Sequence, residues 1–471
     1  MPEPVEPPSS PSSVPSPLST SVSRRRMLTA AGVGAGLAAL KPSSASAAPP
    51  SAAATLTPAP AATPTSDLPL VGGPTFPIGI FWPPPPFEST AARYAEIASA
   101  GIGFVISGNY ADDGYILQFQ LALARDAGLA FLVADDTQML NLCKWFTITD
   151  DRSVPMSIST ADARELVSRA VGAYGPYSSL AGFNLFDEPG ADRFASLATA
   201  MALVREHAPA VLPYLNLLPG TGEGYRAYVT SFVETVRPSV LSFDRYPLLA
   251  VGDDTGYFEN WAIVRQAALD AGIPAWTYVQ TLGFNGHRTP TTAEILWQVN
   301  VSLAYSAKGI QYFTYWTPDP ARGEGFLPAL ITTDGHRTER WNAVRKINTQ
   351  WLTPVGAQLK PLHPDSVVHA GETPLPAGAV GFAPTEVLAS VSGAPFVIGT
   401  FSAGDGSATR WLLVVNRSYA AVATGELTLD ASATQVTRFA PATGQYVDRP
   451  AGTRVPVRLD PGAAMLYRVS R

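Results

Sequence analysis

The sequence predicts an α/β protein, a (β/α)8 TIM barrel followed by a small antiparallel β-sandwich. Short apolar runs alternate with helical stretches eight times between residues 76 and 352. Eight such units over about 275 residues match the strand and helix count of this barrel. No G-x-G-x-x-G loop follows any predicted strand, which excludes the usual dinucleotide-binding open sheet. From residue 367 onwards, short runs separated by Gly, Asp and Pro replace the helical pattern, as in a sandwich.

The barrel elements follow from periodicity and from helix-end signals. Strands buried on both faces are expected as apolar runs at 76–82, 103–107, 130–134, 182–186, 211–217, 240–243, 274–279 and 310–315. Helices are predicted at 89–100, 114–127, 160–174, 191–207, 224–236, 257–271, 291–307 and 337–351. The seventh helix opens with Thr291-Thr-Ala-Glu294, which is a capping box. Ala-Gly pairs at Gly101, Gly128 and Gly272 indicate glycine C-caps.

Composition divides the rest of the chain. Residues 1–47 contain consecutive arginines, a weakly apolar run and a small-residue site ending at Ala47, in the order of an export signal. The arginines resemble a twin-arginine signal, so we expect cleavage near Ala47 and a secreted, extracellular protein. Residues 48–75 are expected to form a Pro/Ala/Thr-rich linker and residues 353–366 a second linker. Sandwich strands are clearest at 411–415, 426–429, 435–439, 454–459 and 464–469.

Charge and cysteine content exclude several classes of protein. The net charge is -6, and the absence of a basic stripe argues against nucleic acid and anionic membrane partners. The apolar run of the signal is too short to span a bilayer. Cys143 is the only cysteine, so no internal disulfide forms, and the five histidines lack metal-ligand spacing. We therefore expect no metal and no cofactor, and no sequence signal indicates an oligomeric state.

The fourth predicted strand ends in two consecutive carboxylates, Asp187 and Glu188. Pro189 and Gly190 cannot continue the strand, so both acids lie at its C-terminal end. In a (β/α)8 barrel that rim carries the chemistry. Desolvating an ionised pair is costly unless the pair has a function. The alternative is that one carboxylate caps the next helix while the other is solvated.

The other strand ends carry aromatic, amide and acidic side chains. Aromatic faces cover the C–H face of a sugar ring, while carboxylates and amides bind its hydroxyls. The candidate sugar ligands are Trp82, Asn109, Asp136, Asn216, Tyr246, Tyr278, Gln280, Tyr315 and Trp316, with Asp244 as a further catalytic candidate. For any single aromatic side chain the alternative is core packing, and for Asp136 it is a helix or loop cap.

These motifs resemble the (β/α)8 glycoside hydrolases of clan A, whose fourth strand ends in Asn-Glu-Pro. The resemblance covers residues 76–352 and implies that Glu188 is the acid/base and Trp316 a platform under the sugar. Two positions depart from it. Asp187 replaces the asparagine, and an Asp-Glu pair is similar to hexosaminidase families 20 and 123, where the Asp orients the substrate's 2-acetamido group. Gln280 stands where clan A has its nucleophilic glutamate, and an amide cannot form a glycosyl ester.

The sequence therefore predicts a secreted glycoside hydrolase that cleaves a poly- or oligosaccharide, with Glu188 as general acid/base. Its partner stays open between Asp187 in substrate-assisted retention, Asp244 as the base in inversion, and Asp244 or Asp136 as a nucleophile. The alternatives are a non-catalytic carbohydrate-binding barrel, or a transglycosylase or lyase that uses the same site.

Overall fold

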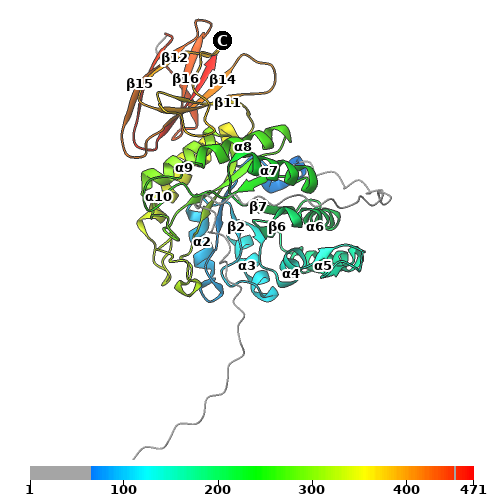
Figure 1. Ribbon diagram of the computed structural model, residues 1–471. Helices are drawn as coiled ribbons and strands as arrows, with labels where there is room; N and C mark the ends of the chain where they lie inside the picture. The colour runs from blue at the N-terminus through cyan, green and yellow to red at the C-terminus, as the bar shows by residue number, and fades with distance from the viewer. Residues whose placement is uncertain (1–64, 450–451) are drawn as a thin grey trace, which may run out of the picture. The chain divides into compact units, whose positions relative to one another are not determined.

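Eight parallel strands close into a barrel surrounded by helices, which confirms the predicted fold class (Figure 1). The computed structural model describes residues 65–449 and 452–471. The export signal and most of the first linker lie outside these residues. The strands pair in the order β1-β10-β9-β8-β7-β6-β3-β2. Their bounds are β1 (Ile78–Phe81), β2 (Phe104–Ile106), β3 (Ala130–Val133), β6 (Leu180–Asp187), β7 (Leu212–Leu217), β8 (Leu241–Phe243), β9 (Ala275–Gln280) and β10 (Ala307–Phe313).

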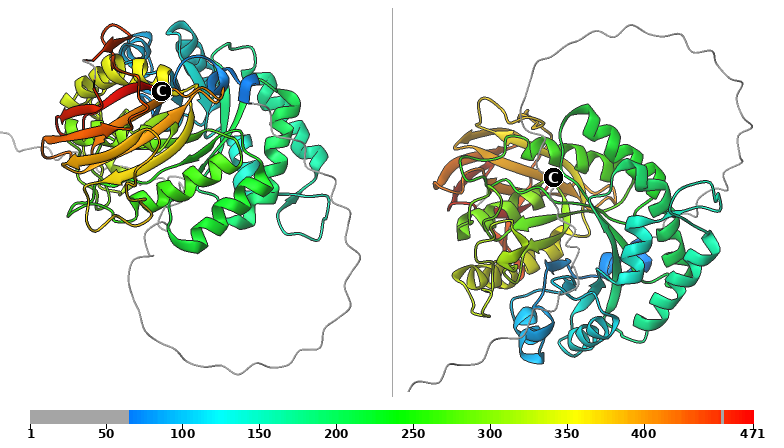
Figure 2. Two further views of the ribbon diagram at one scale, coloured as in Figure 1. Left: turned by 90° about the horizontal axis from the view of Figure 1, so that it is seen from above. Right: turned by 60° about the horizontal axis from the view of Figure 1, so that its bottom comes forward.

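A helix follows each barrel strand, and together the helices form the outer layer (Figure 2). They are α2 (Ala91–Ser99), α3 (Gly114–Asp126), α5 (Thr160–Tyr174), α6 (Phe194–His207), α7 (Gly222–Val236), α8 (Tyr257–Asp270), α9 (Thr292–Ala304) and α10 (Glu339–Ile347). The predicted capping box is present, because Glu294 N donates to Thr291 Oγ1 at 3.3 Å and Thr291 N to Glu294 Oε2 at 2.7 Å. Gly101, Gly128 and Gly272 adopt the left-handed conformation of a C-cap. Among the described residues, none of the helices has the length and apolar character needed to cross a bilayer.

Two segments differ from the predicted pattern. Helix α4 (Thr137–Trp145) and a two-stranded sheet, β4 (Thr147–Ile148) with β5 (Ser157–Ile158), are inserted between β3 and α5. Residues 353–366, expected as a linker, form helix α11 (Thr353–Leu359) and the start of strand β11. Pro354 is compatible with that helix because it lies in the first turn, where a backbone N–H has no intrahelical acceptor.

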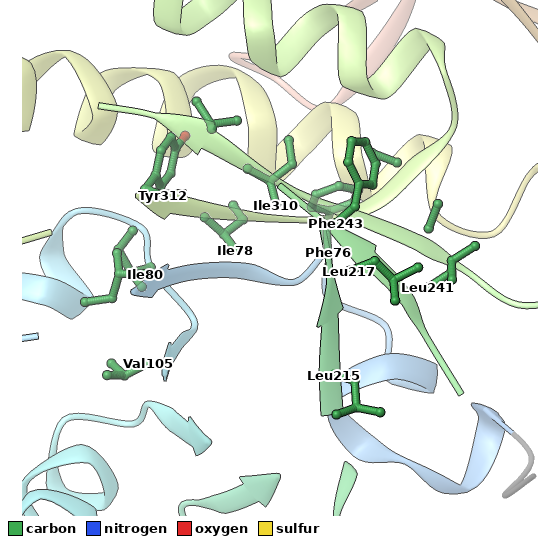
Figure 3. Packing of buried hydrophobic residues seen from close by; sticks show 14 of the residues in the cluster. Phe76, Ile78, Ile80, Val105, Leu215, Leu217, Leu241, Phe243, Ile310 and Tyr312 are labelled. Atoms are coloured by element: carbon green, nitrogen blue, oxygen red, sulfur yellow. The ribbon is translucent and has the colours of Figure 1, made fainter. Parts of the chain in front are cut away.

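The barrel strands present alternate side chains to the helices and to the barrel interior. Figure 3 shows part of the apolar layer between the strands and the helices, with Ile78 and Ile80 of β1 near Ile310 and Tyr312 of β10. Inside the barrel, the rings of Phe104 and Trp276 lie 5.5 Å apart, centroid to centroid. Glycines on neighbouring strands make room for these rings. A Cβ at Gly79 would lie 2.2 Å from the Phe104 ring, and one at Gly309 would lie 2.6 Å from the Trp276 ring.

The C-terminal domain is a β-sandwich, as predicted. A six-stranded antiparallel sheet consists of β11 (His363–Ala370), β13 (Phe396–Ser402), β14 (Arg410–Asn416), β19 (Ala464–Ser470), β16 (Gln435–Ala440) and β17 (Gln445–Asp448), in that spatial order. It packs against a three-stranded sheet of β12 (Leu388–Gly393), β15 (Ala423–Leu429) and β18 (Arg454–Leu459).

Helix α9 joins the barrel to the sandwich. Leu413 and Val415 of β14 belong to the apolar cluster of the barrel, while Leu412 and Val414 belong to the core of the sandwich. The larger sheet is therefore covered on both faces, which explains the unbroken apolar run in β14. Two hydrogen bonds from α9 fix the contact: Trp297 Nε1 donates to the Arg417 carbonyl at 3.0 Å, and Asn300 Nδ2 donates to the Gly462 carbonyl at 2.9 Å.

Substituting Gly309→Ala should lower the free energy of unfolding by about 1–3 kcal/mol, because the added methyl overlaps the Trp276 ring inside a filled barrel. The matched control is Gly172→Ala on helix α5, where a Cβ meets no atom within 4 Å. That change should be neutral or stabilising by about 0.4–1 kcal/mol. Chemical denaturation measures both. Equal midpoints for the two variants would contradict the packing described for the barrel interior.

Candidate active site

Residues just after four neighbouring barrel strands adopt a left-handed backbone conformation. They are Trp82 after β1, Asn109 and Tyr110 after β2, Asp135 after β3 and Glu188 after β6, with φ between 53° and 71°. Such conformations are uncommon for residues with a side chain and tend to gather at functional sites. The C-terminal end of the barrel is therefore the place to look for a site.

Three carboxylates meet at this end of the barrel. Asp187 is the last residue of β6, Glu188 follows it, and Asp244 follows β8. Consecutive residues of a strand point to opposite faces, but the φ of 53° at Glu188 turns the chain. As a result, both Asp187 and Glu188 interact with Asp244. The structure thus brings together the three residues that the sequence predicts as catalytic.

The side-chain amide of Asn216 connects two of these carboxylates. Its Nδ2 donates to Asp244 Oδ1 at 2.8 Å and is 3.3 Å from Asp187 Oδ1. Its Oδ1 accepts a hydrogen bond from Ser242 Oγ at 2.9 Å. Because the Ser242 hydroxyl has a single proton, which it gives to Asn216, Tyr214 must be the donor in the 2.6 Å contact between Tyr214 and Ser242.

A chain of buried donors therefore fixes the orientation of the Asn216 amide. It begins at Gln311 of β10, whose Nε2 donates to the Tyr214 hydroxyl at 3.0 Å. Tyr214, Ser242 and Gln311 are buried in the barrel interior. None of the three was among the candidates that sequence analysis selected. The signal that could have identified them is that each is a polar residue within an otherwise apolar predicted strand.

The three carboxylates do not ionise independently. Burial and the negative charge of Asp187 raise the pKa of Asp244 from 3.8 to about 7, although hydrogen bonds from Asn216 and Glu188 lower it. A carboxyl group can donate a hydrogen bond only while it carries a proton. The hydrogen bond between Glu188 and Asp244 therefore requires a proton on one of the two carboxyl groups, and the two side chains form a coupled pair.

Aromatic side chains surround the carboxylates. The Tyr246 hydroxyl donates to Asp244, and burial together with the nearby carboxylates raises the pKa of Tyr246 well above 10.0. Tyr278 lies in the same inner cluster as Trp82. Ring contacts lead outwards from Tyr246 to Phe313 at 5.1 Å and from Phe313 to Trp82 at 6.2 Å, measured between centroids. Four predicted ligands, Trp82, Asn216, Tyr246 and Tyr278, thus line one continuous region with the carboxylates.

The predicted ligands of strand eight lie outside this region. Tyr315 and Trp316 belong to the outer cluster between strands and helices rather than to the barrel interior. The Tyr315 hydroxyl donates to Glu96 at 3.4 Å, and Arg93 lies over the Trp316 ring at 5.2 Å. Both aromatic side chains are almost completely buried in this setting.

Three further candidates are engaged in local structure. Asp136 caps helix α4 through Met139 N at 2.9 Å and also accepts a hydrogen bond from the Tyr174 hydroxyl at 2.5 Å. Asn109 donates to the Pro83 carbonyl at 2.9 Å. Gln280 is fully buried, and its amide contacts backbone groups of the following loop, including the Arg288 carbonyl at 2.7 Å. Among the described residues, the hydrogen bonds of these three side chains are made with nearby loops and helices and not with the three carboxylates.

The similarity of this chain to known proteins lies in its fold. No protein-family model matches the sequence, and no curated protein matches it. Among solved structures, the chain is similar to the beta-galactosidase from Bacillus circulans sp. alkalophilus, with a TM-score of 0.57, 9% identity, and coverage of 84% of this chain and 99% of that one. A GH27 β-L-arabinopyranosidase from Geobacillus stearothermophilus gives a TM-score of 0.50, 11% identity, and coverage of 85% and 97%. The chain therefore shares its (β/α)8 fold with glycosidases.

Replacing Asp244 should change how stability depends on pH. Between pH about 4 and 7 the folded protein retains a proton on Asp244 that the unfolded chain has released, so the free energy of unfolding falls as pH rises. In Asp244→Asn this side chain has no proton to release, so its contribution to the fall in the free energy of unfolding is absent. Its melting temperature should exceed that of the wild type by about 2–4 °C at pH 8, and the difference should vanish near pH 4.

Differential scanning calorimetry at pH 4, 6 and 8 measures the effect. The exposed Asp126→Asn serves as the control and should melt in parallel with the wild type. If the difference between Asp244→Asn and the wild type is the same at all three pH values, the raised pKa of Asp244 is contradicted.

Proposed function

We propose that the protein is a secreted glycoside hydrolase that cleaves glycosidic bonds of a poly- or oligosaccharide with retention of configuration. The observation that carries the proposal is the meeting of Asp187, Glu188 and Asp244, in which Glu188 is hydrogen-bonded to Asp244 and the Asn216 amide donates to Asp187 and Asp244. Glycosidases need a carboxylic acid that holds its proton and a second carboxylate that stays ionised. The aromatic side chains around the acids supply faces suited to a sugar ring.

In the proposed reaction, Glu188 is the general acid/base and Asp187 the nucleophile. An Asp187 oxygen attacks the anomeric carbon, the bond to the leaving oxygen breaks, and that oxygen takes the proton of Glu188. Ionised Glu188 then removes a proton from water, whose oxygen displaces Asp187 from the sugar and restores both carboxyl groups. Asp244, whose pKa burial and the charge of Asp187 raise to about 7, is in hydrogen-bond contact with Glu188 and exchanges a proton with it.

The direct contact between Glu188 and Asp244 disfavours inversion with Asp244 as the base, because it leaves no room for a water molecule between the two carboxyl groups. Asp187 and Asp244 contact the same Asn216 nitrogen at 3.3 and 2.8 Å, so their nearest oxygens are less than 6.5 Å apart. Glu188 is in direct hydrogen-bond contact with Asp244. Inverting enzymes separate their carboxyl groups by about 6.5–9.5 Å to admit a water molecule, whereas retaining enzymes hold them about 5–5.5 Å apart. Asp136 caps helix α4 and takes no part in the proposed reaction.

Glu188→Gln should lower kcat by about 10²–10⁴-fold, because the amide has no proton to give to the leaving oxygen. Sugar binding should persist, since the size of the side chain is kept. A screen of aryl glycosides and purified polysaccharides measures activity, and NMR of the first product should show the retained anomer. Adding 2-acetamido substrates to the screen separates attack by Asp187 from attack by the substrate's own acetamido group.

The matched control is Glu165→Gln, an exposed change on helix α5 that should leave kcat as it is. Undiminished turnover by Glu188→Gln would overturn its assignment as the acid. Glycan binding without turnover by the wild type would instead indicate a non-catalytic carbohydrate-binding barrel. Release of an unsaturated sugar or of a transfer product would point to a lyase or a transglycosylase.

Export is the second part of the proposal, and it rests on the order of residues in the first 47 positions. Protein collected from the culture medium of a host with a twin-arginine pathway should begin at or near Ala48. N-terminal sequencing measures this directly. A mature chain that starts well before Ala45, or that is retained in the cell with an intact N-terminus, would refute the export signal.

A further inference from the structure

Arg322 lies between two aromatic rings beside the barrel mouth. Its guanidinium carbon is 4.1 Å from the centroid of the Trp82 ring and 4.5 Å from that of Tyr110. The residue ends a short turn (Pro320–Arg322) in the loop after β10, and Asp319 Oδ1 holds the turn through Ala321 N at 2.8 Å. With both rings close to the guanidinium, stacking uses its faces and leaves its in-plane N–H groups for hydrogen bonding.

Those N–H groups have no acceptor among the residues that the structure describes. Within residues 65–449 and 452–471, the Arg322 guanidinium forms no hydrogen bond or ion pair, and its Nε is buried without a partner. Other arginines with a buried, unpartnered Nε each donate another N–H to a backbone carbonyl, as Arg193, Arg205, Arg265 and Arg340 do. Arg245 and Arg288, on neighbouring loops, are paired with aspartates. A buried donor without an acceptor is costly, so Arg322 is suited to an acceptor that arrives with a ligand.

The position of Arg322 connects it to the candidate active site. The Trp82 ring beneath it contacts the Phe313 ring, and Phe313 contacts Tyr246, which donates to Asp244. This series of contacts places Arg322 a few side chains away from the three carboxylates.

We propose that Arg322 selects an acidic glycan, by binding the carboxylate or sulfate group of a sugar next to the cleaved bond. The inference rests on the proposed glycoside hydrolase function. A mouth with three carboxylates repels an anionic sugar unless a cation compensates, and the planar fork of Arg322 fits an oxyanion with two parallel hydrogen bonds. The aromatic rings on both sides hold the fork in place before the ligand binds.

The test is binding by isothermal titration calorimetry, with oligosaccharides of polygalacturonate and hyaluronan as uronate probes and carrageenan oligosaccharides as sulfated probes. Each probe is paired with its neutral counterpart, obtained by carboxyl reduction or desulfation. The wild type should bind at least one charged probe about 10–100-fold more tightly than its neutral counterpart. Arg322→Gln should remove this difference and leave the affinity for the neutral sugar unchanged.

Two further variants separate recognition from structure. Arg322→Lys keeps the charge but loses the fork, so it should retain only part of the preference. Arg125→Gln, an exposed charge change on helix α3, should bind every probe as the wild type does. If Arg322→Gln weakens charged and neutral probes equally, or if the wild type shows no preference for any charged probe, the inference is overturned.

The two proposals fail in different ways. If the wild type binds a uronate or sulfated probe through Arg322 but releases no product from any glycan, the hydrolase function fails and the recognition by Arg322 stands. If the wild type cleaves charged and neutral glycans with the same kcat/KM and Arg322→Gln does so too, the hydrolase function stands and the inference about Arg322 fails.

Discussion

The orientation of one side-chain amide, that of Asn216, determines how the candidate site is assembled. Its oxygen accepts the only proton of Ser242, and its nitrogen faces Asp187 and Asp244. A flipped amide would place its oxygen against two carboxylates and leave Ser242 without an acceptor. In a buried setting both losses are costly. The positions of strands β6, β7 and β8 at the barrel mouth are therefore coupled through a single residue.

The barrel can hold such a network because side chains fill its interior and have little room to move. Phe104 and Trp276 occupy the space left by Gly79 and Gly309. A closed sheet has no free edge, so a change in the position of one strand displaces its neighbours. Helix α9, buried between barrel and sandwich, extends this constraint to the second domain. The carboxylates thus rest on a scaffold whose packing and hydrogen bonds support the same strand positions.

Charge at the barrel mouth links the two proposals. A carboxyl group that keeps its proton near neutral pH needs burial and a neighbouring negative charge, and Asp244 has both. The same negative charge disfavours any anionic ligand. Arg322, stacked on Trp82 and without an acceptor among the described residues, is placed to offset that repulsion at a short distance from the acids. The proposed catalysis therefore requires negative charge at the barrel mouth, whereas the proposed selectivity requires positive charge there. Asp187, Glu188 and Asp244 meet the first requirement, and Arg322 meets the second.

The sequence by itself determined the eight strand–helix units, the capping box at Thr291, the sandwich, and the position of Asp187-Glu188 at the end of a strand. These features depend on local periodicity and local capping, which a single chain segment carries. Only the tertiary structure decided which strand-end side chains face inwards. The left-handed turn at Glu188 directs two consecutive acids towards Asp244, and a bulge between Asn184 and Phe186 shifts the alternation just before them. Tyr315 and Trp316 lie outside the barrel wall, whereas Trp82 lies inside. The direction in which each side chain points depends on how its strand pairs with strands distant in the sequence, and local periodicity does not contain this information.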